Sequence, residues 1–371
     1  MALSLGILCG GRSGEHEVSL RSALGIHRAV DPARFAPLLV AIDKLGRWRT
    51  APLEQLVLDG DDPARIRLNP DAPVVLPASR EGRLALLDPV RLTPLAQVDV
   101  CFPIVHGTDG EDGALQGWLR IQDVPFVGAD VLGSAIGMDK DVMKRLLAQA
   151  GLPVPRFRAL HRMDDFQALF DDLTRELGLP LFVKPASLGS SVGVSRVGDR
   201  PAFERALEDA FRYDSKLIVE EAVAGREIEC SVLGNRHSRD NPPRASRPGE
   251  IVPRHGFYSY AAKYLDDHGA DLLIPATLEP ALEARVRELA LRVFDVLECD
   301  GLARVDFFLR PDGQVLVNEI NTLPGFTPIS MYPKLWEASG LAYRDLISRL
   351  VDLALERHAR RKALKRDFDL G

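Results

Sequence analysis

The stretch Arg304-Val-Asp-Phe-Phe-Leu-Arg-Pro-Asp-Gly-Gln-Val-Leu-Val-Asn-Glu-Ile-Asn321 places two apolar runs on either side of Asp312-Gly313. An Asp-Gly pair between alternating hydrophobic residues is a strong signal for a β-hairpin. With a two-residue loop at Asp312-Gly313, Asp306 lies opposite Glu319 and Arg304 lies opposite Asn321. Because side chains alternate along a strand, all four side chains then share one face of the hairpin.

Two carboxylates that face each other across a hairpin repel, so the pair formed by Asp306 and Glu319 is unfavourable without a counter-charge. A divalent cation removes this penalty, and hard oxygen ligands of this kind suit Mg2+. The sequence therefore indicates a magnesium site with Arg304 beside it, an arrangement suited to handling phosphate. The alternative is that Arg304 pairs diagonally with Glu319 and that this face is an ordinary solvated one.

Length and composition limit the possible classes of protein. The chain has 371 residues, enough for two or three domains. Its composition, 46% apolar and 27% charged, is that of a soluble globular protein. The net charge of −6 argues against a nucleic-acid-binding protein, which usually carries a basic face. The four cysteines form no Cys-x-x-Cys or Cys/His cluster, so neither a zinc site nor a disulfide framework is indicated.

No targeting signal is visible in the sequence. The N-terminus, residues 1–9, lacks the basic region of a signal peptide, and no apolar run approaches the ~20 residues of a membrane span. We therefore expect a cytoplasmic protein with no membrane partner. The basic run over residues 358–366 could bind nucleic acid, but a basic helix C-terminus that complements the helix dipole is the favoured interpretation.

The order of predicted elements is typical of a parallel α/β sheet in the first part of the chain. Residues 3–9, 35–42 and 98–105 are predicted strands, and 20–30 and 114–122 are predicted helices. The segment 49–95 is predicted to be an irregular insertion with a small hairpin. Later in the chain the predicted helices are 138–150, 201–212, 279–298 and 342–365, and the predicted strands are 181–185, 194–197 and 217–223.

A glycine-rich loop, Ser187-Leu-Gly-Ser-Ser-Val-Gly193, lies between two predicted strands. It offers clustered backbone N–H groups and hydroxyls, which suit a phosphate. It is not a Walker loop, because no Gly-Lys-Ser/Thr follows, and not a Rossmann fingerprint, because no helix opens after it. A plain glycine hairpin is the alternative. Lys184 favours the phosphate, because its charge in an apolar strand needs a partner, although its head could also snorkel to the strand edge.

Three further stretches carry candidate binding groups. The loop from Gly10-Gly11 to Ser19 precedes a helix N-terminus, which attracts an anion, while Glu15 in the same loop suits an ammonium group. An amino acid carries both groups. His106 to Gly113 follows a predicted strand, where α/β sheets bind ligands. Surface acids and a structural histidine are the alternatives. Residues 217–227 supply Glu220, Glu221 and Glu227 for an adenine nucleotide, or simply exposed glutamates at a strand end.

These stretches, in this order, resemble the D-alanine–D-alanine ligase family of ATP-grasp enzymes. The resemblance runs from Gly10 to about residue 350. It rests on Gly-Gly-Arg-Ser-Gly-Glu-His-Glu-Val-Ser19, His-Gly-Thr-Asp-Gly-Glu-Asp-Gly113, Met-Asp-Lys140, Val-Lys-Pro-Ala-Ser-Leu-Gly-Ser-Ser-Val-Gly193, Tyr258-Ser-Tyr-Ala-Ala-Lys-Tyr264 and Asn-Glu-Ile-Asn-Thr-Leu-Pro-Gly325. Each motif alone is weak to moderate, and together they are highly specific.

The resemblance implies an α/β (α+β) protein of three domains with an ATP-grasp fold. Residues 1–132 would form an N-terminal, Rossmann-like parallel-sheet domain that binds substrate. Residues 133–216 would form a small central α+β domain, and residues 217–371 the C-terminal catalytic α+β domain. The resemblance also implies a homodimer.

Residue roles carry over from the family where this sequence matches its motifs. Asp306, Glu319 and Asn321 are expected to hold two Mg2+ ions, with Mn2+ as an alternative. The expected ATP contacts are Lys140, Lys184, Glu220, Glu221, Val223, Glu227, Lys263 and Phe308. The expected catalytic groups are Glu15, Ser190 and Tyr264, which form a network that locks a mobile loop, and Arg304 and the Gly325 N–H, which stabilise an oxyanion. The expected substrate contacts are Glu15, Val18, His106, Ser330 and Met331.

The reaction that the family implies fits these residues. ATP would phosphorylate one D-alanine, and a second D-alanine would attack the acyl phosphate to give D-alanyl-D-alanine for peptidoglycan. The stretch 258–271 is expected to form a water-excluding lid. Lys263-Tyr264 resembles the dipeptide-forming members, whereas D-lactate-using relatives carry a different loop. The alternatives are a D-alanine–D-lactate ligase, another carboxylate–amine ligase, and a non-catalytic nucleotide sensor. A Rossmann oxidoreductase is disfavoured because Gly10–Gly14 lacks the G-x-G-x-x-G spacing.

Overall fold

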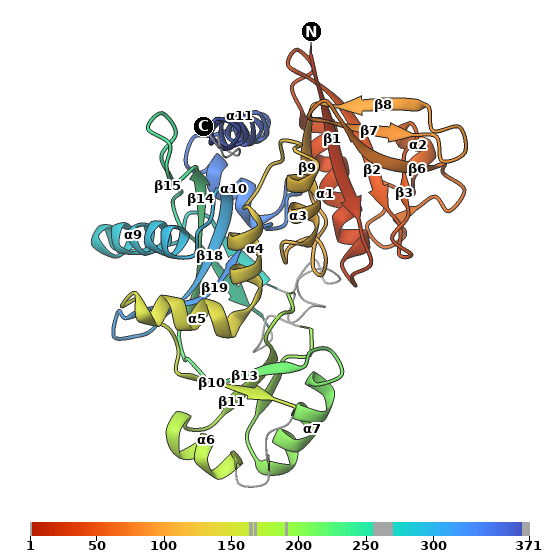
Figure 1. Cartoon of the computed structure of the whole chain (residues 1–371). Helices are drawn as coiled ribbons and strands as arrows, with labels where there is room; N and C mark the ends of the chain where they lie inside the picture. The colour runs from red at the N-terminus through yellow and green to blue at the C-terminus, as the bar shows by residue number, and fades with distance from the viewer. Residues whose placement is uncertain (1, 163–165, 167–168, 190–191, 255–269, 366–371) are drawn as a thin grey trace, which may run out of the picture.

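The computed structural model describes residues 2–162, 166, 169–189, 192–254 and 270–365. Figure 1 shows three lobes, each built around one β-sheet. The N-terminal part lies at the upper right, residues 157–221 form the lower lobe, and the C-terminal sheet with its helices lies at the left. Among the described residues, no helix combines the length and apolar character needed to cross a membrane.

The first sheet has seven strands in the order β8-β7-β6-β3-β2-β1-β9. They are β1 Leu3–Gly10, β2 Phe35–Ile42, β3 Trp48–Arg49, β6 Val74–Arg80, β7 Arg83–Leu87, β8 Pro94–Val98 and β9 Val100–Pro103. Strand β1 pairs in parallel with both β2 and β9, as the strand–helix–strand pattern predicted. Helix α1, His16–Ala29, connects β1 to β2 and buries Leu20, Ala23, Leu24 and Ile26.

The segment 49–95 differs from the prediction of an irregular insertion. Strands β3, β6, β7 and β8 add to the edge of the parallel sheet by antiparallel pairing. Val75, Leu84 and Leu86 are buried in one core with Leu8 and Val40 of the parallel strands. The apolar pieces of the segment therefore complete the first sheet. The small hairpin that was predicted is β6–β7. Helix α2, Leu53–Leu56, and strands β4, Val57–Leu58, and β5, Arg67–Leu68, lie between β3 and β6.

The second sheet has four strands in the order β10-β13-β11-β12. They are β10 Phe157–His161, β11 Leu181–Pro185, β12 Ser195–Val197 and β13 Lys216–Glu221. Helices α6, Leu169–Leu177, and α7, Arg200–Ala210, pack on the face that carries Leu181, Val183, Leu217 and Val219. Because side chains alternate, Phe182, Lys184 and Glu220 belong to the other face.

The third sheet includes β14 Arg226–Gly234, β15 Arg244–Ala245, β16 Gly249–Pro253, β17 Ala270–Leu273, β18 Gly301–Leu309 and β19 Val315–Asn321. Helix α9, Pro280–Val296, covers the face that buries Ile228, Cys230, Val305 and Val317. Helices α10, Met331–Glu337, and α11, Tyr343–Lys362, follow, and α11 joins the core of the first sheet. The other face of β14 and β18 carries the charged residues Glu229, Arg304 and Asp306, and near one end Leu233 and Leu302, which join the core of the first sheet.

The β18–β19 hairpin has the predicted residue pairing but a different loop. Its loop has three residues, Pro311-Asp312-Gly313, closed by hydrogen bonds from Arg310 N to Gln314 O and from Gly313 N to Arg310 O. Gly313 takes a positive φ of 84°, which suits glycine. A β-bulge between Asp306 and Phe307 then shifts the register back by one residue. Asp306 therefore lies opposite Glu319, and Arg304 opposite Asn321, as predicted.

Three helices join the first sheet to the others: α3 Ala114–Ile121, α4 Val131–Met138 and α5 Lys140–Gln149. The helix predicted over 138–150 is confirmed as α5, which begins two residues later because Asp139 is extended; the preceding helix α4 was not predicted. The Asp139 carboxylate caps α5 by accepting a hydrogen bond from Val142 N at 3.0 Å. The division into three domains after residues 132 and 216 stays a prediction, and we propose moving the second boundary past β13, which pairs within the four-stranded sheet.

Candidate active site

Acidic side chains gather on the polar face of the third sheet around one arginine. Asp306 and Glu319 are cross-strand neighbours, and Glu229 of β14 lies opposite Asp306 on the other side. Arg304 forms two hydrogen bonds with Asp306, each of 2.7 Å, and its Nε lies 2.9 Å from Glu229 Oε2. Asn321 Nδ2 donates to Asp306 Oδ2 at 2.9 Å. The predicted metal-site residues and the predicted arginine are thus brought together.

The carboxylates of this face stabilise the charged form of Arg304. Burial alone would lower the pKa of Arg304, but the negative charges of Asp306 and Glu229 outweigh it and raise that pKa well above its usual value. The side chain of Arg304 is only 16% exposed. Arg304 forms ion pairs with Asp306 and with Glu229.

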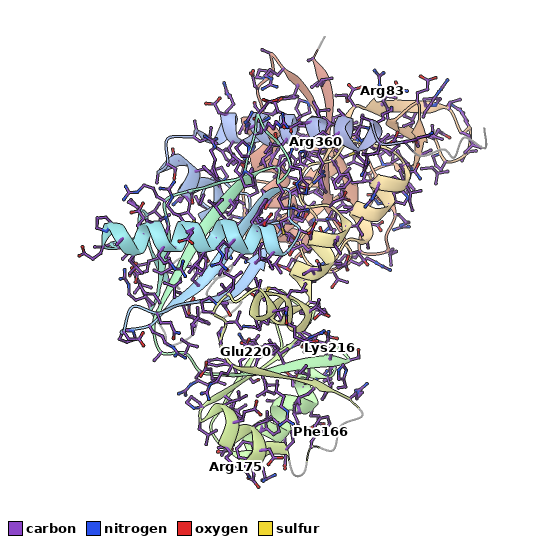
Figure 2. The ribbon with its side chains drawn as sticks, turned by 60° about the vertical axis from the view of Figure 1, so that its left-hand side comes forward. Arg83, Phe166, Arg175, Lys216, Glu220 and Arg360 are labelled. Atoms are coloured by element: carbon purple, nitrogen blue, oxygen red, sulfur yellow. The ribbon has the colours of Figure 1, made fainter. Side chains whose placement is uncertain are left out.

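A second charged cluster lies between helix α5 and the second sheet. The Glu220 carboxylate lies 2.7 Å from Lys144 Nζ and 2.5 Å from Lys184 Nζ. Glu220 is 2% exposed and Lys144 is fully buried. Burial alone would raise the pKa of Glu220, but the two ammonium groups lower it to about 2. Figure 2 shows Glu220 and Lys216 of β13 at the edge of the lower lobe that approaches α5.

This cluster holds two positive charges and one negative charge. Substitutions of its acidic and its basic members are therefore expected to have different effects on stability. Replacing Glu220 by glutamine removes the nearest counter-charge of two buried ammonium groups, and we expect it to lower the free energy of unfolding by about 3–5 kcal/mol. Replacing Lys144 by methionine leaves the pair of Glu220 and Lys184, and we expect a change below about 1.5 kcal/mol. Urea denaturation of both variants measures this difference, and equal losses would contradict it.

Lys140 connects three parts of the site from the first turn of α5. Its Nζ donates to Leu188 O at 2.7 Å, and it lies 3.5 Å from Glu319 Oε2. Its backbone N–H donates to Ala186 O at 2.9 Å. The start of α5 therefore holds the beginning of the glycine-rich loop next to the hairpin. Ser190 of that loop lies outside the described residues, as do Lys263, Tyr264 and the predicted lid up to residue 269.

The residues near the end of β13 that are expected to contact the nucleotide have different surroundings. The carboxylate of Glu221 is bound by Arg156, at 2.8–2.9 Å, and by Arg310, at 3.2 Å. Val223 follows the strand and is half-buried. Glu227 lies opposite Phe308, on the same sheet face as Glu229 and Asp306. The acids at 220 and 221 are thus engaged in ion pairs.

The N-terminal loop lies against both glycine-containing loops. Gly107 has a φ of 76°, and a Cβ there would come within 2.8 Å of Glu15 Oε2. The same oxygen lies 3.6 Å from the Cβ position of Gly189, so Glu15 is close to the glycine-rich loop. Ser19 fixes the start of α1, because its Oγ donates to Ile104 O at 2.5 Å and accepts from Gly10 N at 2.8 Å. Val18 lies in the first turns of α1 and is half-buried.

His106 is buried between α1 and the segment after β19. Its Nε2 lies 3.0 Å from Ser22 Oγ, and its Nδ1 lies 3.2 Å from Leu323 O and 3.5 Å from Glu111 Oε1. Burial alone would lower the pKa of His106, but the hydrogen bond to Glu111 and its charge outweigh burial and raise that pKa above 6.5. A protonated ring can donate from both nitrogens, which suits these partners.

This raised pKa makes stability depend on pH. The protonated form of His106 is favoured more in the folded than in the unfolded state, so its contribution is full below pH 6.5 and is lost as the pH rises through the folded-state pKa. We expect His106→Gln to lose less stability than the unsubstituted protein as the pH rises above 6.5. Chemical denaturation at several pH values measures this, and parallel curves would contradict it.

The segment after β19 carries the last expected groups. Thr327 N donates to Ser330 Oγ at 3.1 Å, and the two hydroxyls of Thr327 and Ser330 lie 2.8 Å apart. A Cβ on Gly325 would lie 3.2 Å from Ser330 Oγ, so Gly325 and Ser330 are neighbours. Met331 begins α10 and is buried with Ile251. Gly325, whose N–H is predicted to stabilise the oxyanion, therefore lies close to Ser330, which is predicted to bind the second substrate.

Sequence reasoning missed two buried charged residues of the site, Lys144 and Glu229. Both had a signal in their spacing. Lys144 is four residues after Lys140 and shares its face of a helix, and Glu229 is two residues after Glu227 and shares its face of a strand. Neither position was recognised because each pattern also fits an ordinary solvated face.

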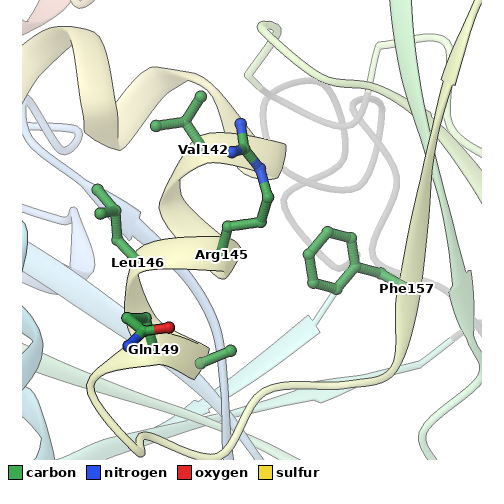
Figure 3. A pocket seen from close by; sticks show the side chains of 6 residues that line it. Val142, Arg145, Leu146, Gln149 and Phe157 are labelled. Carbon is green, nitrogen blue, oxygen red and sulfur yellow. The ribbon is translucent and has the colours of Figure 1, made fainter.

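A hollow of about 620 Å³ lies beside the site, between α5 and β10. Figure 3 shows Arg145 of α5 and Phe157 of β10 on its two sides, with Val142, Leu146 and Gln149 along the helix. With 3.6 residues per helical turn, these positions lie on a different side of α5 from Lys140 and Lys144, so the hollow does not adjoin the lysine face of the helix. We assign it no part in the chemistry.

Comparisons with known families identify relatives over both halves of the chain. Residues 4–129 match the family described as D-ala D-ala ligase N-terminus, and residues 146–352 match D-ala D-ala ligase C-terminus. D-alanine–D-alanine ligase A of Escherichia coli strain K12 is 52% identical over 363 residues, which is 98% of each chain. A D-alanine–D-alanine ligase of Oceanobacillus iheyensis is 51% identical over 367 residues, also 98% of each.

Solved structures are similar over the same extent. The structure of the D-alanine–D-alanine ligase from Coxiella burnetii superimposes with a TM-score of 0.84 at 38% identity, covering 97% of this chain and 96% of the other. VanG D-Ala:D-Ser ligase from Enterococcus faecalis has a TM-score of 0.81 at 31% identity, covering 95% of this chain and 100% of the other.

Proposed function

The chain belongs to the D-alanine–D-alanine ligase family, and from that premise we propose how its own residues carry out the reaction. The protein is an ATP-dependent ligase with the ATP-grasp fold, and it joins two D-alanines to D-alanyl-D-alanine for peptidoglycan synthesis. The observation that carries this conclusion is the 52% identity over 98% of the chain. The acidic face around Arg304 supports the roles proposed below.

Asp306, Glu319 and Asn321 are the proposed ligands of two Mg2+ ions, for which Mn2+ could substitute. Their carboxylate and amide oxygens are the hard donors that suit Mg2+, and two of them face each other across the hairpin. When bound, the metal would neutralise charge on the triphosphate. Among the described residues, no group of three or more His, Cys, Asp or Glu side chains is arranged to bind a metal ion. The Asp306 carboxylate accepts hydrogen bonds from Arg304 and Asn321. Metal binding therefore requires Asp306 to exchange partners.

ATP is proposed to lie between the second and third sheets. Lys140 and Lys184 would contact its phosphates together with Lys263, and Phe308 would pack against the adenine. Glu220, Val223 and Glu227 would contact the base and ribose. Glu221, whose carboxylate is bound by two arginines, would contribute through its main chain. The position of Lys184 beside buried Glu220 supports this arrangement, because the cluster retains a net positive charge that a phosphate would balance.

The first D-alanine would be held by Glu15 and Val18, with His106 nearby. Its carboxylate oxygen attacks the γ-phosphorus of ATP, ADP leaves, and an acyl phosphate forms. Arg304 would stabilise the negative charge that develops on the transferred group. The Ser190–Tyr264–Glu15 network would lock the lid that excludes water from this hydrolysable intermediate.

The second D-alanine would bind by its carboxylate at Ser330 and Met331. Its amine attacks the carbonyl carbon of the acyl phosphate, the tetrahedral oxyanion is stabilised by Arg304 and the Gly325 N–H, and inorganic phosphate leaves. The attacking nitrogen loses its proton and becomes the amide of the dipeptide. The neighbouring positions of Gly325 and Ser330 support a shared role in this step. We also propose that the enzyme works as a homodimer in the cytoplasm.

A coupled assay of ADP release tests the substrate assignment. We expect turnover with D-alanine, none with L-alanine, and D-alanyl-D-alanine as the product. Adding D-lactate or D-serine beside D-alanine tests the two other second substrates, and product analysis at several pH values separates the three outcomes. A main product containing D-lactate or D-serine would overturn the assignment, and ATP binding without any D-alanine-dependent turnover would favour a non-catalytic nucleotide sensor.

A further inference from the structure

Arg304 has two carboxylate partners, of which only one belongs to the proposed metal ligands. Its Nε lies 2.7 Å from Asp306 Oδ1 and 2.9 Å from Glu229 Oε2. Glu229 is 5% exposed and sits in the middle of β14, in register with Asp306. Besides the proposed metal ligands, this face carries Glu227, which is assigned to the nucleotide, and Glu229, whose carboxylate lies against Arg304.

Asp306 accepts hydrogen bonds from two side chains on this face. Arg304 donates to both of its oxygens, and Asn321 donates to Oδ2. A divalent cation bound to Asp306 would compete with Arg304 for the same oxygens. A guanidinium that is 16% exposed cannot lose its counter-charge without a large desolvation penalty. Arg304 therefore needs another anion when the metal binds.

We propose, building on the function assigned above, that Glu229 is a positioning residue that keeps Arg304 in place and releases Asp306 to the divalent cation. In the nucleotide-free protein, Arg304 shares its charge between Glu229 and Asp306. When the metal and nucleotide bind, Arg304 stays on Glu229, with its remaining donors available for the phosphoryl group. Glu229 touches neither substrate nor metal in this arrangement.

The test measures how strongly nucleotide binding depends on Mg2+. A non-hydrolysable ATP analogue is titrated into the full-length protein by calorimetry over a series of Mg2+ concentrations. In Glu229→Gln, Asp306 is the remaining anion for Arg304, so we expect the Mg2+ concentration for half-maximal binding to rise about tenfold, the effect of a coupling of ordinary size between neighbouring charges. Thermal unfolding checks that the variant is folded.

Two further variants separate positioning from a simple charge effect. Glu229→Asp keeps the charge but withdraws the carboxylate from Arg304, so positioning predicts a similar rise, whereas a charge effect predicts unchanged Mg2+ dependence. In an Arg304→Met background, positioning predicts that Glu229→Gln no longer raises the Mg2+ requirement. If Glu229→Gln does not fold, Glu229→Asp provides the test of positioning instead.

Glu250→Gln is the matched control. Glu250 is a buried glutamate on the neighbouring strand β16, paired with Arg226 at 2.6 Å, and it belongs to the opposite face of the sheet. We expect its Mg2+ dependence to be unchanged. Unchanged Mg2+ dependence in Glu229→Asp, or a rise that persists in the Arg304→Met background, would overturn the role of Glu229. Absence of Mg2+-linked binding in the unsubstituted protein would instead overturn the proposed metal site.

Discussion

Replacing Glu319 by glutamine is expected to lower kcat by about 10²- to 10³-fold or more while the protein stays folded. Glutamine keeps the size of the side chain but removes one of the two carboxylates that face each other on β18 and β19. The proposed metal ions would lose a charged ligand, and charge on the transferred phosphoryl group would be less well compensated. Steady-state ADP release at saturating D-alanine and ATP measures the loss.

The fold of the Glu319 variant should be preserved, since Glu319 is half-buried rather than part of a core. Glu337→Gln, which changes an exposed glutamate at the end of α10, is the control and should retain full turnover. Near-normal kcat for Glu319→Gln at limiting Mg2+ would refute the metal role of this residue.

Replacing Arg304 by lysine is expected to cost a similar factor in kcat, about 10²- to 10³-fold, with KM for ATP changed much less. Lysine preserves the positive charge but not the planar fork that binds Asp306 through two hydrogen bonds and reaches Glu229. If Arg304 stabilises charge that develops only during the reaction, its loss should appear in kcat. Initial-rate kinetics with varied ATP separate the two parameters.

The lysine substitution also tests whether the charge alone is sufficient. Arg310→Lys is a suitable comparison, because Arg310 forms an ion pair with Glu221 at 3.2 Å but lies outside the acidic face. We expect it to affect kcat little. A kcat for Arg304→Lys within a few-fold of the unsubstituted value would contradict a role for the guanidinium geometry.

The hairpin shows which structural features local sequence patterns can predict and which they cannot. Alternation and the Asp-Gly turn predicted the pair formed by Asp306 and Glu319 correctly, although the loop has three residues and not two. The bulge after Asp306 compensates for the longer loop. Neither feature has a separate signal in the sequence, because the bulge depends on how the strand packs within the sheet.

Other parts of the site depend on contacts between distant segments. The segment 49–95 looked irregular because its short apolar pieces acquire strand structure by pairing with one another and with β2. The cluster of Lys144 and Glu220 unites residues far apart in the chain, so helix periodicity alone could not indicate that Lys144 is buried. By contrast, the parallel strands β1 and β2 were predicted from their apolar runs alone, because a strand buried on both faces needs such a run.

The central claim is that the acidic face of the hairpin couples a divalent cation to ATP. The most direct test is calorimetric titration of a non-hydrolysable ATP analogue into the protein, with Mg2+ present and with Mg2+ removed by a chelator. We predict binding at least about tenfold weaker without Mg2+, and loss of most of that difference in Glu319→Gln. Equal affinity with and without Mg2+, or an undiminished Mg2+ effect in the variant, would contradict the account.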